Sequence, residues 1–208
     1  MKKVLFLDLN GTLVDDWGQA YTGMKAIFDH YDRPAPSLKE FIKAVAFNGD
    51  YTSFYNKHEI GKDGMDLHDV YLPAYHRVIN DVSVVPFLHE VLEELKKAGV
   101  EIHLLTAARR DFADRLVELS GVAKYCEAFH FHIHNKAAQV EAVISGMDVD
   151  QKNCFMVGDL PSDVLHSKKA GIKGIALLNS HVPRELFSEI TEMDLAIFDL
   201  RGLLKFVL

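Results

Sequence analysis

The sequence predicts an α/β fold in which helices cover both faces of a parallel β-sheet and a helical insertion interrupts the sheet near its start. Three observations support this prediction. Short apolar runs alternate with stretches of helical pattern along most of the 208 residues, which is the βαβ spacing of a parallel sheet. The alternation stops between about residues 15 and 83. Two of the apolar runs end in carboxylates, at the position where open α/β sheets bind ligands.

Six apolar runs have the length and composition of buried strands. They are Val4–Leu7, Val100–Leu105, Phe129–Ile133, Cys154–Val157, Ile175–Leu178 and Leu195–Phe198. The helical patterns of the same region are Pro86–Ala98, Arg110–Ser120, Ala137–Ser145, Asp163–Ala170 and Arg184–Ile190. We therefore expect residues 1–14 and 84–208 to form one core domain.

The region from 15 to 83 reads as four helical segments with no convincing strand between them. The segments are Trp17–Tyr31, Ser37–Phe47, Tyr51–Glu59 and Met65–Asn80. Turn-like sequences rich in Pro, Gly, Asn and Asp separate them. We expect residues 15–83 to form a separate helical domain inserted after the first strand.

Composition excludes several classes of partner. The formal net charge is −7, which argues against a general nucleic-acid binder or a protein that binds acidic membranes. The two cysteines form no Cys-x-x-Cys motif, which favours a reducing, cytoplasmic compartment. The apolar stretch Leu195–Leu208 is interrupted by charged residues and should not span a membrane. Oligomeric state does not follow from the sequence.

Two of the predicted strands deliver carboxylates at their carboxyl ends. Val4–Leu7 runs into Asp8-Leu9-Asn10-Gly11-Thr12-Leu13, and Cys154–Val157 runs into Gly158-Asp159-Leu160-Pro161-Ser162-Asp163. The Gly11-Thr12 backbone can turn sharply and direct N–H groups at an anion. These features predict a ligand site at one edge of the sheet.

The two motifs resemble the first and last signature motifs of the haloacid dehalogenase superfamily, and the helical insertion resembles its type 1 cap, as in the phosphoglycolate phosphatase and β-phosphoglucomutase group. The resemblance covers nearly the whole chain. It implies a Rossmann-like catalytic core at 1–14 and 84–208 and a cap domain at 15–83. It also implies a Mg²⁺-dependent phosphatase that acts on a small phosphorylated metabolite through a phospho-aspartate intermediate.

The resemblance assigns the metal ligands. Asp8 would be the nucleophile and would also bind Mg²⁺, together with the backbone carbonyl of Asn10 and the carboxylates of Asp159 and Asp163. Ligation by oxygen atoms and water is what Mg²⁺ prefers. A backbone carbonyl is indifferent to its side chain, so an Asn at position 10 should leave metal binding intact.

The resemblance also assigns phosphate contacts. Thr106, at the end of the Val100–Leu105 run, and Lys136 would bind the phosphoryl group, next to Gly11 and Ala107. A cation such as Lys136 is also required physically. Two carboxylates about 4 Å apart repel each other by roughly 4 kcal/mol at an effective dielectric constant near 20.

Asn10 departs from the phosphatase pattern, in which an Asp at this position is the general acid and base. An amide can do neither. Three explanations stay open: a natural variant with slow or altered chemistry, an engineered substitution that traps an intermediate, or an idle protein that binds phosphate for regulation. Asn10→Asp is expected to raise the steady-state rate by about 10²-fold or more if the rest of the site is competent. If the chain is already fast, His58 or Asp15 would be the first residues to test as the proton carrier.

Other interpretations fit less well. Lys57 and His58 bear a faint likeness to the Schiff-base lysine region of phosphonatases, and dehalogenases of the superfamily need no metal cluster. His130, His132 and His134 alternate along a predicted strand and so share one face. They could bind a transition metal, although a half-exposed strand face is the interpretation that we favour.

Overall fold

Six parallel strands form the main sheet, in the order β5-β4-β1-β6-β7-β8. The computed structural model describes residues 2–47, 51–178, 181–190 and 194–208. The strands are β1 (Lys3–Leu7), β4 (Val100–Leu105), β5 (Ala128–His130), β6 (Cys154–Gly158), β7 (Lys173–Leu177) and β8 (Leu195–Ile197). The predicted fold class is therefore confirmed.

The central strand β1 places the site. Its residues Val4–Leu7 are fully buried, as expected of a strand covered on both faces. β1 lies between β4 and β6, with Leu7 level with Leu104 on one side and Val157 on the other. Loops that follow these three strands therefore meet at one edge of the sheet, where the strand order changes direction.

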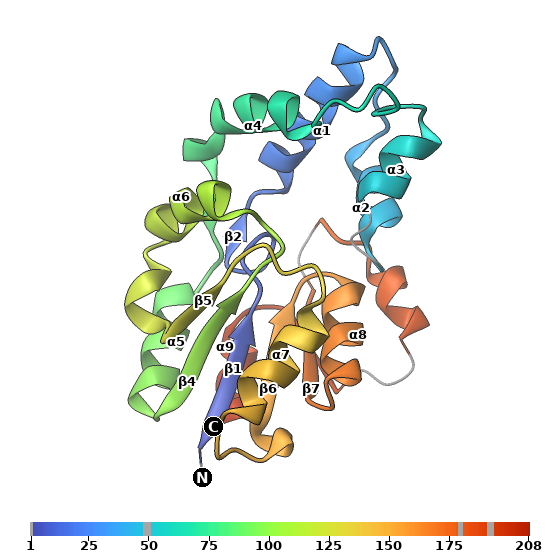
Figure 1. Cartoon of the computed structure of the whole chain (residues 1–208). Coiled ribbons are helices and arrows are strands. Elements are labelled where there is room, and N and C mark those ends of the chain that lie inside the picture. The colour runs from blue at the N-terminus through green and yellow to red at the C-terminus, as the bar shows by residue number, and fades with distance from the viewer. Residues whose placement is uncertain (1, 48–50, 179–180, 191–193) are drawn as a thin grey trace.

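Helices cover both faces of this sheet (Figure 1). They are α5 (Leu88–Lys97), α6 (Arg110–Ser120), α7 (Lys136–Ser145), α8 (Pro161–Lys169) and α9 (Arg201–Val207). Leu5 and Leu7 share a core with apolar residues of α5, α6 and α9. Val4 and Phe6 share another with residues of α7. This alternation follows from the two-residue period of a strand.

A second group of helices lies beyond the carboxyl ends of the strands (Figure 1). It contains α1 (Trp17–His30), α2 (Leu38–Val45), α3 (Tyr51–Lys57) and α4 (His68–His76). Ser37 and Glu40 form a capping box that fixes the start of α2. Phe28, Phe41 and Phe54 are buried together and pack ring against ring. We call residues 17–81 the helical segment.

A short antiparallel β-ribbon joins the two ends of the helical segment. Strand β2 (Val14–Asp15) pairs antiparallel with β3 (Ser83–Val84), so that Asp15 lies opposite Ser83. The sequence did not predict these strands, because two residues carry no measurable alternation. The predicted boundaries at 15 and 83 fall on this ribbon; that residues 15–83 are a separate domain stays a prediction.

Several predicted elements differ from the structure. The segment Arg184–Glu189 is a 3₁₀ helix, as are Ile79–Asp81, Val122–Tyr125 and Gln151–Asn153, which suits runs this short. The strand predicted at Phe129–Ile133 ends at His130, because His132 has a φ of 59° and breaks the extended backbone. Helix α9 was not predicted. No helix among the described residues is both long and apolar enough to cross a membrane.

Candidate active site

Five of the predicted site residues lie at the carboxyl edge of the sheet. Asp8 follows β1, Thr106 follows β4 and Asp159 follows β6. Lys136 is the first residue of α7, and Asp163 lies in the first turn of α8. All five are buried. Residues as far apart as 8 and 163 in the sequence therefore converge, as strand order alone requires.

Lys136 joins two of the carboxylates. Its Nζ donates to Asp8 Oδ1 at 2.6 Å and to Asp163 Oδ1 at 2.7 Å. Burial raises the pKa of Asp8 to about 6, and the Lys136 ammonium opposes that rise. For Lys136, burial favours the neutral amine, but the two carboxylates outweigh it and raise the pKa above its ordinary value. The ammonium therefore stays charged and holds Asp8 ready to ionise.

Asp159 lies beside this pair and is fully buried. Its Oδ2 accepts a hydrogen bond from Trp17 Nε1 at 2.8 Å, and its Oδ1 lies 3.3 Å from Thr12 Oγ1. One oxygen each of Asp8, Asp159 and Asp163 lie within 4.8 Å of one another. Three carboxylates against one ammonium leave two negative charges, and oxygen ligands in this number suit a divalent ion such as Mg²⁺.

Two glycines permit this crowding. Gly11 has a φ of +72°, and a Cβ there would collide with the Asp159 carboxylate and the Trp17 indole. A Cβ on Gly158 would collide with the Asp163 carboxylate. Only a residue without a side chain lets the backbone approach the acidic groups this closely.

Asn10 belongs to a hydrogen-bond chain of its own. Its Nδ2 donates to Asp16 Oδ2 at 2.6 Å, and its Oδ1 accepts from Thr106 Oγ1 at 3.3 Å. Thr106 thus contacts Asn10, and its Oγ1 also accepts from the Ala108 N–H at 3.1 Å. The position of the Asn10 carbonyl as a metal ligand stays a prediction.

Asp16 is the main residue that sequence reasoning missed. It is 3% exposed and accepts hydrogen bonds from Gly11 N at 3.0 Å and Tyr75 Oη at 2.7 Å, in addition to the Asn10 amide. Burial raises its pKa, against these three donors. The Gly11 N–H, expected to face an anion, also donates to Val14 O at 2.8 Å. Ala107, expected to contact phosphate, is half-buried beside Thr106.

Aromatic residues of the helical segment also reach the site. Trp17 is the sole tryptophan of the sequence and contacts Asp159 directly. Tyr51 is exposed as a residue, but burial of its hydroxyl raises its pKa, and the carboxylates of Asp16, Asp8 and Asp159 raise it further. The signal in the sequence for this contact was the position of the single tryptophan, a few residues after the Asp8 motif.

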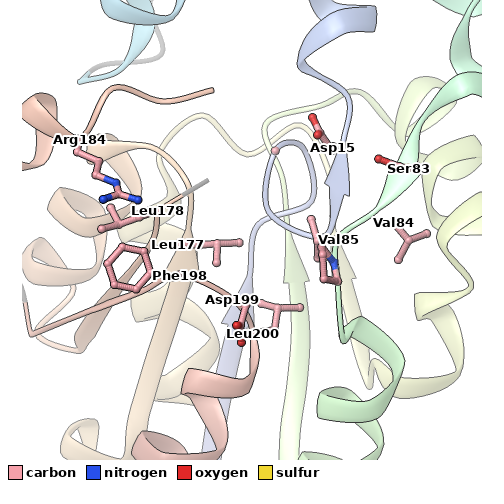
Figure 2. A pocket seen from close by; sticks show the side chains of 12 residues that line it. Asp15, Ser83, Val84, Val85, Leu177, Leu178, Arg184, Phe198, Asp199 and Leu200 are labelled. Carbon is pink, nitrogen blue, oxygen red and sulfur yellow. The ribbon is translucent and has the colours of Figure 1, made fainter. Parts of the chain in front are cut away.

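The two residues proposed as alternative proton carriers have other partners in the structure, and their role stays a prediction. Asp15 pairs with His181 at 3.0 Å and lines a cavity of about 560 Å³, together with Gly11, Arg184 and Phe198 (Figure 2). His58 packs against the rings of Phe28 and Phe54, at centroid distances of 5.0 and 5.1 Å.

The Lys57 and histidine alternatives find no support among the described residues. Lys57 is exposed on α3, unlike a lysine held for Schiff-base chemistry. His130 hydrogen-bonds His103 and Gln139, whereas His132 packs against His134. Within the described ranges, the acidic cluster at Asp8 is the group whose ligand atoms come close enough to hold a metal.

Comparisons with known proteins identify the family of this chain. A model of the family described as haloacid dehalogenase-like hydrolase matches residues 4–177. Pyrophosphatase PpaX of Bacillus velezensis is 24% identical over 205 residues, which cover 91% of this chain and 93% of that protein. Phosphoglycolate phosphatase of Vibrio parahaemolyticus is 26% identical over 193 residues, which cover 84% of this chain and 83% of that one.

Solved structures show the same fold. A hydrolase from Pseudomonas syringae superposes with a TM-score of 0.80 at 19% identity, over 99% of this chain and 98% of that one. A haloacid dehalogenase-like hydrolase from Streptococcus pneumoniae superposes with a TM-score of 0.78 at 16% identity, over 100% and 99%. With the family model spanning β1 to β7, this chain belongs to the haloacid dehalogenase-like hydrolases.

Proposed function

We propose that this hydrolase removes the phosphoryl group of a small phosphorylated metabolite through a phospho-Asp8 intermediate. The observation that carries the proposal is the buried bridge from Asp8 through Lys136 to Asp163, with Asp159 alongside. A nucleophilic carboxylate needs a nearby cation to stay ionised, and the cluster needs a metal to balance its charge. The relatives' names, pyrophosphatase and phosphoglycolate phosphatase, support phosphate chemistry.

The residues present suit Mg²⁺. Asp8, Asp159 and Asp163 would hold the ion, with the Asn10 carbonyl as the further protein ligand. Their donor atoms are all oxygen, and the Trp17 and Thr12 contacts orient Asp159. When bound there, Mg²⁺ supplies positive charge next to the phosphoryl oxygens.

The reaction has two steps. An Asp8 oxygen attacks phosphorus, the bond from phosphorus to the leaving oxygen breaks, and that oxygen takes up a proton from solvent water. Water then attacks the phospho-Asp8, which releases inorganic phosphate and restores the carboxylate. Lys136 would stabilise the charge of the nucleophile and of the transferring group, and the Thr106 hydroxyl would donate a hydrogen bond to that group. The Asn10 amide supplies no proton in the first step and accepts none from water in the second.

The helical segment is proposed to act as a cap that excludes water and selects the substrate. Trp17 from α1 already contacts an acidic residue of the core. A site covered in this way suits a metabolite better than a phosphoprotein. Because the chain is acidic, we propose that the enzyme is cytoplasmic and has no nucleic-acid or membrane partners.

Asn10 also supports a second candidate, a catalytically idle phosphate-binding protein. Kinetics on activated substrates separate the two. Without the acid, aryl and acyl phosphates should react better than alkyl phosphates, and without the base the phospho-Asp8 should accumulate. We expect a burst near one equivalent, slow turnover and a covalent adduct detected by mass spectrometry, absent in Asp8→Asn. A protein that binds phosphate but forms no adduct on any substrate is the idle binder.

A further inference from the structure

The buried carboxylate of Asp16 is held entirely by hydrogen-bond donors. Its Oδ2 lies 2.6 Å from Asn10 Nδ2 and 2.7 Å from the Tyr75 hydroxyl, and its Oδ1 lies 3.0 Å from the Gly11 N–H. The side chain amide of Asn10 provides the shortest of these contacts. A carboxylate needs such donors when it is taken out of water. Because Oδ2 has its closest donor at residue 10, an ionised Asp16 favours a donor at that position.

We propose that Asn10 and Asp16 form a matched pair in which Asp16 is a positioning residue: its carboxylate fixes the Asn10 amide, so an Asp functions at position 10 only when residue 16 becomes a donor. The pairing itself stands on the hydrogen bonds above, and its kinetic consequence rests on the proposed phosphatase function. It replaces the sequence-based expectation that Asn10→Asp alone is sufficient to raise the rate.

Asp16 settles which way the amide of Asn10 points. Because Nδ2 is taken by Asp16, Oδ1 faces Thr106 Oγ1, 3.3 Å away. Asp16 immediately precedes α1, and Tyr75 lies in α4 with its ring 4.4 Å from that of Phe112 in α6. The orientation of residue 10 is thus anchored in the helical segment as well as in the core.

A substituted carboxylate at position 10 would lack these contacts. In Asn10→Asp it would face Asp16 at about the separation of the present hydrogen bond, where the two carboxyl groups cannot both be ionised. They either repel each other or share a proton, and a proton held between them keeps residue 10 from exchanging one with the substrate. In the exchange Asn10→Asp/Asp16→Asn, the new amide at 16 donates to the new carboxylate at 10. Its oxygen still accepts from Gly11 N–H, its nitrogen can donate to Tyr75, and Thr106 donates to position 10 as before. The exchange changes neither the size nor the charge of the pair.

Thermal unfolding with a metal chelator tests the pairing without any substrate. We expect Asn10→Asp and Asp16→Asn each to lower Tm, by about 5 °C or more for the former, since a few kcal/mol shifts Tm by this order in a chain of this size. The double variant should recover most of the loss. Asp15→Asn is the matched control, because its carboxylate pairs with His181 and should not rescue Asn10→Asp. Additive losses in the double variant overturn the pairing.

Kinetics test the positioning role. We expect Asn10→Asp alone to stay within a few fold of the unsubstituted chain, and Asn10→Asp/Asp16→Asn to exceed it by about 10²-fold in kcat with KM little changed. If Asp16 had only a structural role, these substitutions would change Tm but not the ratio of kcat between the double variant and the unsubstituted chain. A full gain in Asn10→Asp alone overturns the positioning role. If no variant hydrolyses any phosphate while Tm still shows rescue, the pair stands and the proposed function fails.

Discussion

The indole nitrogen of Trp17 donates a 2.8 Å hydrogen bond to Asp159 Oδ2, so a helix of the inserted segment contacts one of the acidic groups at the carboxyl edge of the sheet. The contact is buried on both sides. Because Trp17 is the sole tryptophan of the chain, its fluorescence reports on this one position. Any ion that binds Asp159 should change the signal.

Mg²⁺ binding should depend on Asp159. We expect Mg²⁺ to raise Tm and to change the Trp17 fluorescence of the unsubstituted chain, and Asp159→Asn to weaken binding at least tenfold, because it removes a charged ligand at constant size. Titration followed by fluorescence and calorimetry measures both effects. The control is Asp29→Asn, which alters an exposed pair with Lys25. Unchanged affinity in Asp159→Asn would rule out this metal site.

Metal affinity should rise with pH between about 5 and 7 and then level off. Asp8 holds its proton up to about pH 6 in the folded protein, against 3.8 ordinarily, and a proton competes with the ion for the carboxylate. Between these values the folded chain binds more protons than the unfolded one, so this group's contribution to stability falls as pH rises. Mg²⁺ should therefore raise Tm more at pH 7.5 than at pH 5. A shift independent of pH would contradict the assignment.

Lys136 should be essential to stability when no metal is bound. Lys136→Met leaves the buried carboxylates of Asp8 and Asp163 without their ammonium, a change that costs about 3–5 kcal/mol for a buried pair. Urea unfolding in the presence of a chelator measures the loss, and Mg²⁺ should restore part of it. Lys25→Met breaks a pair exposed on both sides and should cost no more than about 1 kcal/mol. Equal losses of unfolding free energy in the two variants would show that the buried bridge stabilises the protein no more than an exposed ion pair does.

The sequence predicted those parts of the fold that rest on periodicity. Buried strands such as Val4–Leu7 are continuous apolar runs, and their alternation with helices fixes a parallel sheet. Because parallel strands end at one edge, the approach of Asp8 to Asp159 could be expected from the order of elements alone. Short elements such as the β2–β3 ribbon could not, since two residues have no periodicity.

The hydrogen-bond partners within the site could not be predicted from the sequence. Asp15 ends β2 and Asp16 follows it, yet the carboxylate of Asp15 pairs with His181 and that of Asp16 with Asn10. Which of them turns inward depends on backbone angles set by the β2 pairing. Tyr75 reaches Asp16 from 59 residues away, a contact that only the packing of α4 defines.

Gly11→Ala should cost more stability than the same substitution at a glycine with a similar backbone angle and free space around it. Gly11→Ala meets two penalties: a φ of +72°, which costs an alanine roughly 1–2 kcal/mol, and a Cβ that collides with Asp159 and Trp17. Gly64→Ala meets only the first, because Gly64 has a φ of +80° and nothing within 4 Å of the added Cβ.

The difference in unfolding free energy between the two alanine variants therefore isolates the steric cost at the acidic cluster. We expect about 1–3 kcal/mol beyond the cost of Gly64→Ala, the range for overpacking a close-packed site. We also expect weaker Mg²⁺ binding and altered Trp17 fluorescence in Gly11→Ala alone, because relief of the collision must displace the Asp159 carboxylate or the indole. Equal losses with unchanged fluorescence would mean that the loop can withdraw from Asp159 freely, and that the close approach of Gly11 does not help to hold that carboxylate in place.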